Sequence, residues 1–178
     1  MKHRNVIVAL AALFVAAAAA PAAEGQAAEH PILGVWSLDT DASSYSPGTG
    51  PMGQRRRFWT DDEGFVYVNR ITVAPNGNPN FAITRMKFDG RDYPVWSMAA
   101  ITTLMADGTR PAMTASFEMV GERALRLTQK NAEGEVGPLG PNMWEVSADG
   151  GTLTVTTSGT NANGEQVNNV EVYRRVED

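Results

Sequence analysis

The side chains that could do chemistry in this chain of 178 residues are arginines, carboxylates and aromatic rings, because it contains no Cys and only two His. His3 lies in an apolar leader, and His30 follows in what we expect to be a flexible lead, so no histidine is expected inside the folded domain. The chain then lacks the residues for a His zinc cluster, a Ser-His-Asp triad, a His general base or a reactive thiol. We therefore expect no metal, no cofactor and no catalytic residue, and predict that the protein is not an enzyme.

Three consecutive arginines, Arg55, Arg56 and Arg57, are the most suggestive polar feature of this acidic chain. On a strand, alternation sends Arg55 and Arg57 to one face and Arg56 to the other. We expect Arg55 or Arg57 to reach a cavity mouth and hold a carboxylate or phosphate group of a ligand. The alternative is surface charge paired with nearby acids.

Aromatic and Met side chains are numerous for a domain of this size. Flat rings and polarisable thioethers suit the wall of a cavity for an apolar or aromatic guest, and a packed core without a ligand is the alternative. The residues expected to line such a cavity are Trp59, Tyr67, Met86, Phe88, Trp96, Phe117 and Met119.

Glycines in turn-forming clusters recur every 13 to 18 residues from Gly64 to Gly164, and the segments between them alternate between apolar and polar residues. Gly, Asn and Asp supply the backbone conformations of tight hairpins, so this spacing predicts an antiparallel meander. The predicted strands cover 32–38, 54–60, 65–73, 80–88, 92–104, 112–120, 123–130, 140–147, 152–158 and 166–176.

So many sequential antiparallel strands must protect their edges. Closure into an up-and-down β-barrel of about eight to ten strands removes the edges altogether, and a two-sheet sandwich is the competing solution. The regular hairpin spacing favours the barrel. The predicted fold class is therefore all-β, with one long irregular connection at 39–53.

Three segments resemble secreted bacterial lipocalin-like proteins, a largely uncharacterised group. They are Gly34-Val35-Trp36 with the residues that follow it, Phe88-Asp89-Gly90-Arg91-Asp92-Tyr93-Pro94-Val95, and the ending from Thr156 to Arg174.

The resemblance implies a calycin-type barrel in which Gly34 and Trp36 are structural and an Arg near the last strand packs over Trp36. Strand parity favours Arg174 for this role over Arg175. It also implies that the loop at 39–53 lies over the cavity mouth as a lid, with Tyr45 and Met52 able to touch a guest.

Residues 1–23 are typical of a secretory signal peptide, with Lys2 and Arg4 before an apolar run and a cleavage site somewhere between 20 and 28. We expect a flexible lead at 24–31 and one domain at 32–178, which is secreted, periplasmic or extracellular and has no membrane span after cleavage. Removal leaves 13 basic and 20 acidic residues, a net charge of −7, which argues against a nucleic-acid partner.

We therefore predict a barrel that binds a small apolar or amphipathic molecule in its interior. One alternative is an envelope interaction module with a filled barrel core and an exposed apolar patch. The other is a His-free barrel enzyme, which requires Tyr67, Tyr93, Glu118 or Glu145 to point inward next to an Arg.

Overall fold

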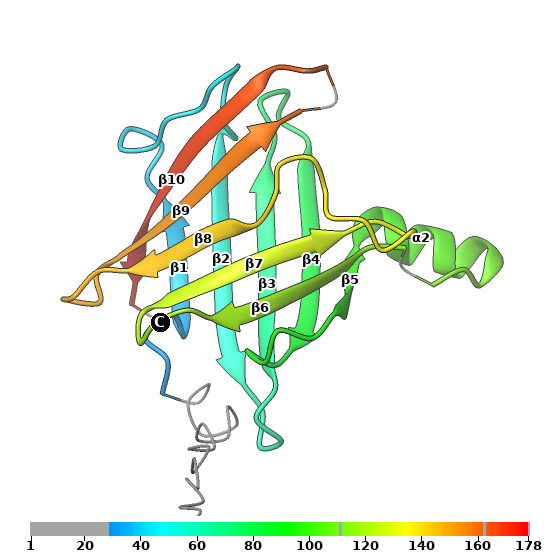
Figure 1. The fold of residues 1–178 in the computed structure, drawn as a ribbon, viewed down its shortest axis with the longest axis horizontal. Helices are drawn as coiled ribbons and strands as arrows, with labels where there is room; N and C mark the ends of the chain where they lie inside the picture. Colours follow the sequence, from blue (N-terminus) through cyan, green and yellow to red (C-terminus); the bar gives the residue numbers. More distant parts are fainter. Residues whose placement is uncertain (1–28, 111, 162, 178) are drawn as a thin grey trace, which may run out of the picture.

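Ten strands and one helix make up the fold in the computed structural model, which describes residues 29–110, 112–161 and 163–177 (Figure 1). The elements are β1 (Gly34–Leu38), β2 (Gly53–Thr60), β3 (Val66–Val73), β4 (Pro79–Met86), β5 (Tyr93–Ser97), α2 (Met98–Asp107), β6 (Thr114–Met119), β7 (Ala124–Lys130), β8 (Asn142–Val146), β9 (Thr152–Thr160) and β10 (Gln166–Val176).

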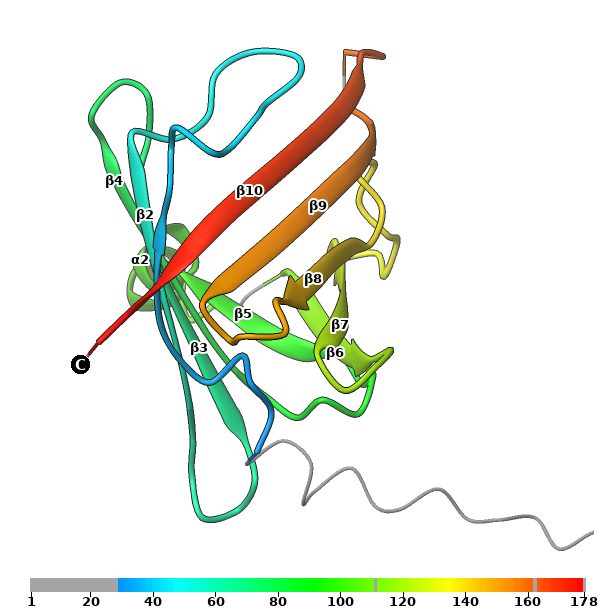
Figure 2. The same ribbon diagram turned by 90° about the vertical axis from the view of Figure 1, so that its left-hand side faces the viewer.

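Each strand pairs antiparallel with its neighbours in sequence, and β1 also pairs with β10, so the sheet closes into a barrel. The predicted all-β, up-and-down antiparallel barrel is confirmed, and the sandwich is excluded. Figure 2 shows the two walls from the side, with β1–β4 forming one wall and β6–β9 the wall that faces it.

Three of the hairpins use the same five-residue turn. In the first, the Asp61 carboxylate accepts hydrogen bonds from the backbone N–H groups of Glu63 and Phe65, and Gly64 has a φ of 75°. Asn131 and Asn161 accept the same pair of bonds in their own turns. Gly fits the left-handed position that each turn requires, which is why the glycine spacing marked the hairpins correctly.

The predicted strand at 92–104 is wrong in its second half. Strand β5 ends at Ser97, and α2 begins at the next residue. The Ser97 hydroxyl accepts a hydrogen bond from Ala100 N at 3.1 Å, and Gly108 ends the helix with a φ of 78°. An N-cap serine and a C-terminal glycine are the ordinary boundaries of a helix, and here they decide the structure of an apolar segment.

Apolar side chains fill one end of the barrel. Phe117 meets Trp144 at 5.2 Å and Phe88 at 5.8 Å between ring centroids, both in edge-to-face geometry, and Phe58 meets Trp144 at 6.0 Å. Such contacts add to the stabilisation from burial itself.

Trp36 closes this end of the barrel. It is fully buried, and its indole N–H donates to the carbonyl of Ile32 at 2.7 Å. The guanidinium of Arg175 stacks over the ring at 4.2 Å and donates to the carbonyls of Leu33 and Gly150. A Cβ at Gly34 would lie only 2.6 Å from Arg175, which explains the glycine of the Gly-x-Trp pattern.

The stacking residue is therefore Arg175, and the prediction of Arg174 is wrong. Arg174 lies on the outer face and pairs with Asp39 at 2.9 Å. The error came from assuming that the valines of β10 face the interior. The inner face of this strand instead carries the polar residues Glu171 and Tyr173.

His30 is packed beneath the barrel floor rather than in a flexible lead, with 3% of its surface exposed. Its Nδ1 accepts a hydrogen bond from Ile32 N at 3.2 Å, and its ring meets the edge of Phe88 at 5.5 Å. Burial lowers the pKa of His30 to about 4. The predicted signal peptide at 1–23 and residues 24–28 of the predicted lead lie outside the described residues.

We expect the free energy of unfolding to fall by about 2 kcal/mol between about pH 7.5 and about pH 5 because of His30. The unfolded chain binds a proton at His30 below about pH 6.5, whereas the folded chain stays neutral there down to about pH 4, so stability is lost as the pH falls. Urea unfolding at a series of pH values measures this loss.

In His30→Asn the side-chain oxygen can still accept the bond from Ile32 N but does not titrate. The loss between about pH 6.5 and about pH 5 should then shrink to that of the carboxylates. An unchanged slope in this variant would show that His30 does not cause the pH dependence.

Candidate ligand site

Two adjoining pockets lie in the barrel and beside it. The inner cavity has a volume of about 50 Å³, and the outer pocket, about 420 Å³, lies between the barrel and α2. Four residues line both spaces: Arg70, Ala82, Val95 and Gln129. Figure 1 shows α2 projecting from the side of the barrel at the end of β5.

The volumes decide what each space can hold. A cavity of about 50 Å³ accommodates a few waters or a group the size of a carboxylate, but is far smaller than the roughly 150 Å³ that admits benzene. The outer pocket, at about 420 Å³, falls within the range of about 300 to 1,000 Å³ that is usual for small-molecule sites. A guest would therefore place a small group inside and its body outside.

Arg56 points into the barrel from β2, with 8% of its side chain exposed. Its guanidinium carbon lies 4.4 Å from the ring of Trp144 and 5.1 Å from that of Tyr173. The same group forms an ion pair with Glu171 at 3.2 Å. These three partners compensate the cost of burying the charge.

A chain of polar groups continues from this pair towards the barrel mouth. The Tyr173 hydroxyl donates to Glu171 at 2.6 Å and also lies 2.5 Å from Oε1 of Gln54, whose amide donates to Thr72 at 2.9 Å. Burial raises the pKa of Tyr173, as does the charge of Glu171. Tyr173 therefore stays protonated as a hydrogen-bond donor.

Arg70 differs from Arg56, because no hydrogen bond or ion pair joins its side chain to any residue that the structure describes. It lines both pockets from β3. Burial lowers its pKa, and the positive charge of Arg56 adds to the effect. The charge of Glu171 acts in the opposite direction on this pKa, so Arg70 is a half-buried cation that is attracted to Glu171 but forms no ion pair with it.

Two further donors at the inner cavity have no partner among the described residues, Nε of Arg56 and Nε1 of Trp144. Buried donors of this kind are ordinarily hydrogen-bonded. Arg56 and Trp144 both line the inner cavity with Arg70, so these N–H groups lie in residues of its wall.

The predicted cavity residues divide between the inside and the outside of the barrel. Met86 and Phe117 line the inner cavity, and Phe88 and Met119 belong to the core or pack against it. Phe88 and Met119 line neither pocket, and the other three predicted residues lie outside the barrel. Trp59 and Tyr67 stack on each other on the outer face, 5.1 Å apart, and Trp96 lies on the face opposite the inward Val95.

Arg55 and Arg57 also lie outside, so the prediction that one of them reaches the cavity is corrected. Both are exposed and border a shallow outer pocket of about 190 Å³ with Val35, Asn69 and Ile71. The alternation along β2 was inferred correctly, but Arg56 takes the inner face because the rings and the carboxylate that surround it lie there.

The loop at 39–53 runs alongside β10, where Ser44 and Val170 exchange two backbone hydrogen bonds. Tyr45 is half-buried in it, and its ring fills the space that a side chain at Gly50 would need. Burial raises the pKa of Tyr45 to about 12, and the charge of Glu171 contributes. Met52 is 65% exposed. A contact between either residue and a guest remains a prediction.

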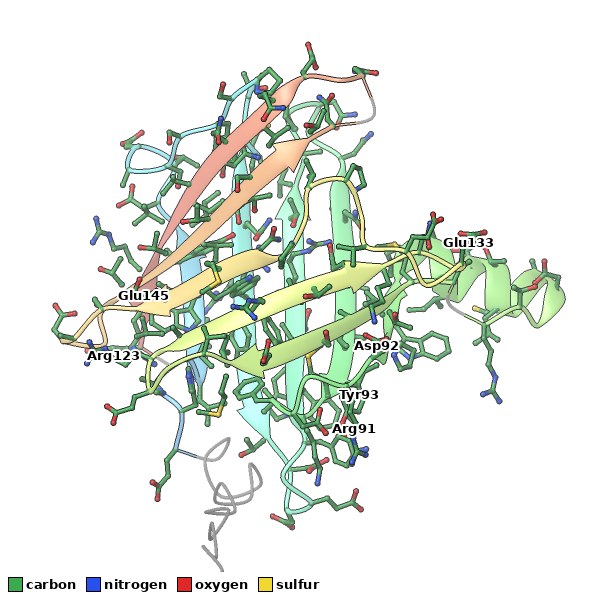
Figure 3. The ribbon with its side chains drawn as sticks, viewed as in Figure 1. Arg91, Asp92, Tyr93, Arg123, Glu133 and Glu145 are labelled. Atoms are coloured by element: carbon green, nitrogen blue, oxygen red, sulfur yellow. The ribbon has the colours of Figure 1, made fainter. Side chains whose placement is uncertain are left out.

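The four residues named for the enzyme alternative do not meet inside the barrel: Tyr93 packs against the core with its hydroxyl donating to Asp89 at 3.0 Å, and the other three lie elsewhere. Figure 3 shows Glu145 beside Arg123 at the edge of the barrel and Tyr93 next to Arg91 near the start of β5. Tyr67 contacts Arg85 on the outer face, and Glu118 pairs there with Arg126. Among the described residues no cluster of three His, Asp or Glu could hold a metal ion, and no helix is long and apolar enough to span a membrane.

Comparison with known proteins bears on the fold alone. No family model matches the sequence, and no curated protein matches it. Among solved structures, Rv2717c from M. tuberculosis is 16% identical with a TM-score of 0.50, covering 89% of this chain and 99% of its own. The zebrafish ileal bile acid-binding protein complexed with cholic acid is 12% identical with a TM-score of 0.45, covering 82% and 99%. The likeness to Rv2717c supports the barrel fold.

Arg70→Met is expected to raise the free energy of unfolding of the unliganded protein by about 1 kcal/mol, because it removes a half-buried cation that has no hydrogen bond or ion pair with a described residue. Arg56→Met is expected to lower it by about 3 kcal/mol, because Glu171 loses its cation and two rings lose their stacking partner. Urea unfolding of both variants gives the two values. A similar loss in both would mean that Arg70 has a structural partner after all.

Proposed function

We propose that this chain is a secreted lipocalin-like barrel that binds a small amphipathic molecule in the two pockets and catalyses no reaction. The observation that carries the proposal is the side chain of Arg70, which is half-buried, has no hydrogen bond or ion pair with a described residue and lies on the shared wall of both spaces. A buried charge without compensation is costly, so its retention is most simply explained by a ligand that compensates it.

The dimensions support a guest of moderate size and affinity. Burial of about 300 Å² of ligand surface at roughly 25 cal/mol per Å² gives about 7 kcal/mol before the costs of association. Those costs reduce the net value to that of a micromolar complex. The outer wall for such a guest is supplied by Ala99, Ala100 and Thr103 of α2.

The two alternatives have less support. A filled interaction module has no need for the two pockets or for the unpaired Arg70. A barrel enzyme would have to use Arg56, Glu171 and Tyr173, the group of arginine, carboxylate and tyrosine that does meet inside. Glu171 forms an ion pair with Arg56 and accepts a hydrogen bond from Tyr173, so the three groups already have partners. The raised pKa of Tyr173 also makes it a poor proton donor to a substrate at neutral pH.

Secretion is part of the proposal and rests on the leader at 1–23. In a bacterium that exports the full chain, the protein recovered from the periplasm or medium should have a new N-terminus within 20–28. N-terminal sequencing identifies it. A chain that remains in the cell with its leader intact would contradict secretion without affecting the binding proposal.

Binding is tested with hexanoate, octanoate and 3-phenylpropanoate, together with the alcohol of each, by isothermal titration calorimetry. Ala100→Trp should fill the outer pocket and weaken the observed binding at least tenfold. Ala106→Trp is the matched control, since Ala106 is exposed on the same helix and does not line the pocket. If none of the six compounds binds, or if both variants bind equally well, the proposed function is wrong.

A further inference from the structure

We infer that the interior selects monoanionic ligands, and that Glu171 sets this selectivity by neutralising one of the two inward-facing guanidinium groups. The inference rests on the proposed function and specifies the charge of the ligand. Its basis is the number of charges at the inner end of the site and the volume available there.

Two cations line the inner cavity, Arg56 and Arg70, and no carboxylate does. Glu171 does not line the cavity and pairs with Arg56 at 3.2 Å, and its charge also attracts Arg70. The group of three therefore has a net charge of +1, concentrated on Arg70. In a site that is partly shielded from water, the stable complement is one negative charge, since an excess charge of either sign is screened less well there than in bulk water.

Two other arginines do not change the net charge of +1 at the inner end of the site. Arg110 borders only the outer pocket, where it is exposed to water and therefore screened. Arg175 lies at the opposite end of the barrel against Trp36 and the carbonyls of Leu33 and Gly150.

A carboxylate suits the site in shape as well as in charge. Its two oxygens can accept from the guanidinium of Arg70 and from the unpartnered N–H groups of Arg56 and Trp144. The volume of about 50 Å³ admits a group of that size and excludes a ring. A neutral amide or alcohol would leave the charge of Arg70 uncompensated, and a dianion would leave one negative charge in excess.

The test compares octanoate, octanamide and octyl phosphate, which each contain a linear chain of eight carbons and carry charges of −1, 0 and −2 at about pH 8. 3-Phenylpropanoate, 3-phenylpropanamide and 3-phenylpropyl phosphate form a second series, in which a phenyl ring replaces part of the alkyl chain. We expect the carboxylate to bind at least tenfold more tightly than the amide and the phosphate of its series, as measured by calorimetry.

Glu171→Gln raises the net charge of the inner group from +1 to +2 and should shift the preference from carboxylate towards phosphate by at least tenfold. Its amide oxygen can still accept from Arg56 and Tyr173, so the network need not collapse. Glu118→Gln is the matched control, because Glu118 pairs with Arg126 on the outer face and the substitution changes the total charge equally. This control should leave the preference unchanged.

Arg70→Gln gives an independent measurement that leaves the pair of Arg56 and Glu171 intact, in case Glu171→Gln does not fold. The net charge of the inner group becomes zero, and the amide should then bind at least as well as the carboxylate. If the wild type binds all three head groups equally, or if Glu171→Gln and Glu118→Gln have the same preferences, the inference is overturned while binding in the interior stands. If no compound of either series binds, the proposed function falls and the inference with it.

Discussion

The arrangement of the interior depends on the ion pair and the ring contacts of the buried Arg56 guanidinium. This guanidinium is placed by β2, whereas its aromatic neighbours and its carboxylate belong to β8 and β10. A charge with so little exposed surface is tolerated only with partners, and these partners come within reach because the sheet closes. Closure and the buried ion pair therefore require each other, and together they fix which faces of β2 and β10 point inward.

The ion pair also divides the barrel into two ends with different properties. Towards Trp36 the interior is apolar and filled, and stability comes from burial, from aromatic edge contacts and from the stacked Arg175. Towards α2 the interior leaves space, and Arg70 lies on the wall of both pockets. Phe117 and Trp144 belong to the core and also line the inner cavity, so the packed core forms the inner limit of the space that could hold a guest.

Much of the fold could be predicted from the sequence, because its signals are local. Turn motifs such as Asp61 with Gly64 mark the hairpins, and alternation marks the strands between them. Which face of each strand points into the barrel was harder to predict from the sequence. The inner face of β10 is polar, so an apolar criterion favoured Arg174 over Arg175. Likewise, Arg56 faces inward because of Glu171, which lies 115 residues away in the sequence. Helix α2 did have local signals, in Ser97 and Gly108, but its apolar residues were interpreted as part of a strand.

Arg70 could not be singled out from the sequence, because what matters is the lack of a partner among its spatial neighbours. The part of the barrel wall beside Arg70 is also held by few contacts. No residue of α2 is buried, and the strands that flank this helix, β5 and β6, share only two residue pairs in their register, Tyr93 with Ala115 and Pro94 with Thr114. A segment with so few buried contacts belongs to the least stable part of a structure and opens at low cost. The barrel is therefore least constrained at the place where a ligand would have to pass to reach Arg70.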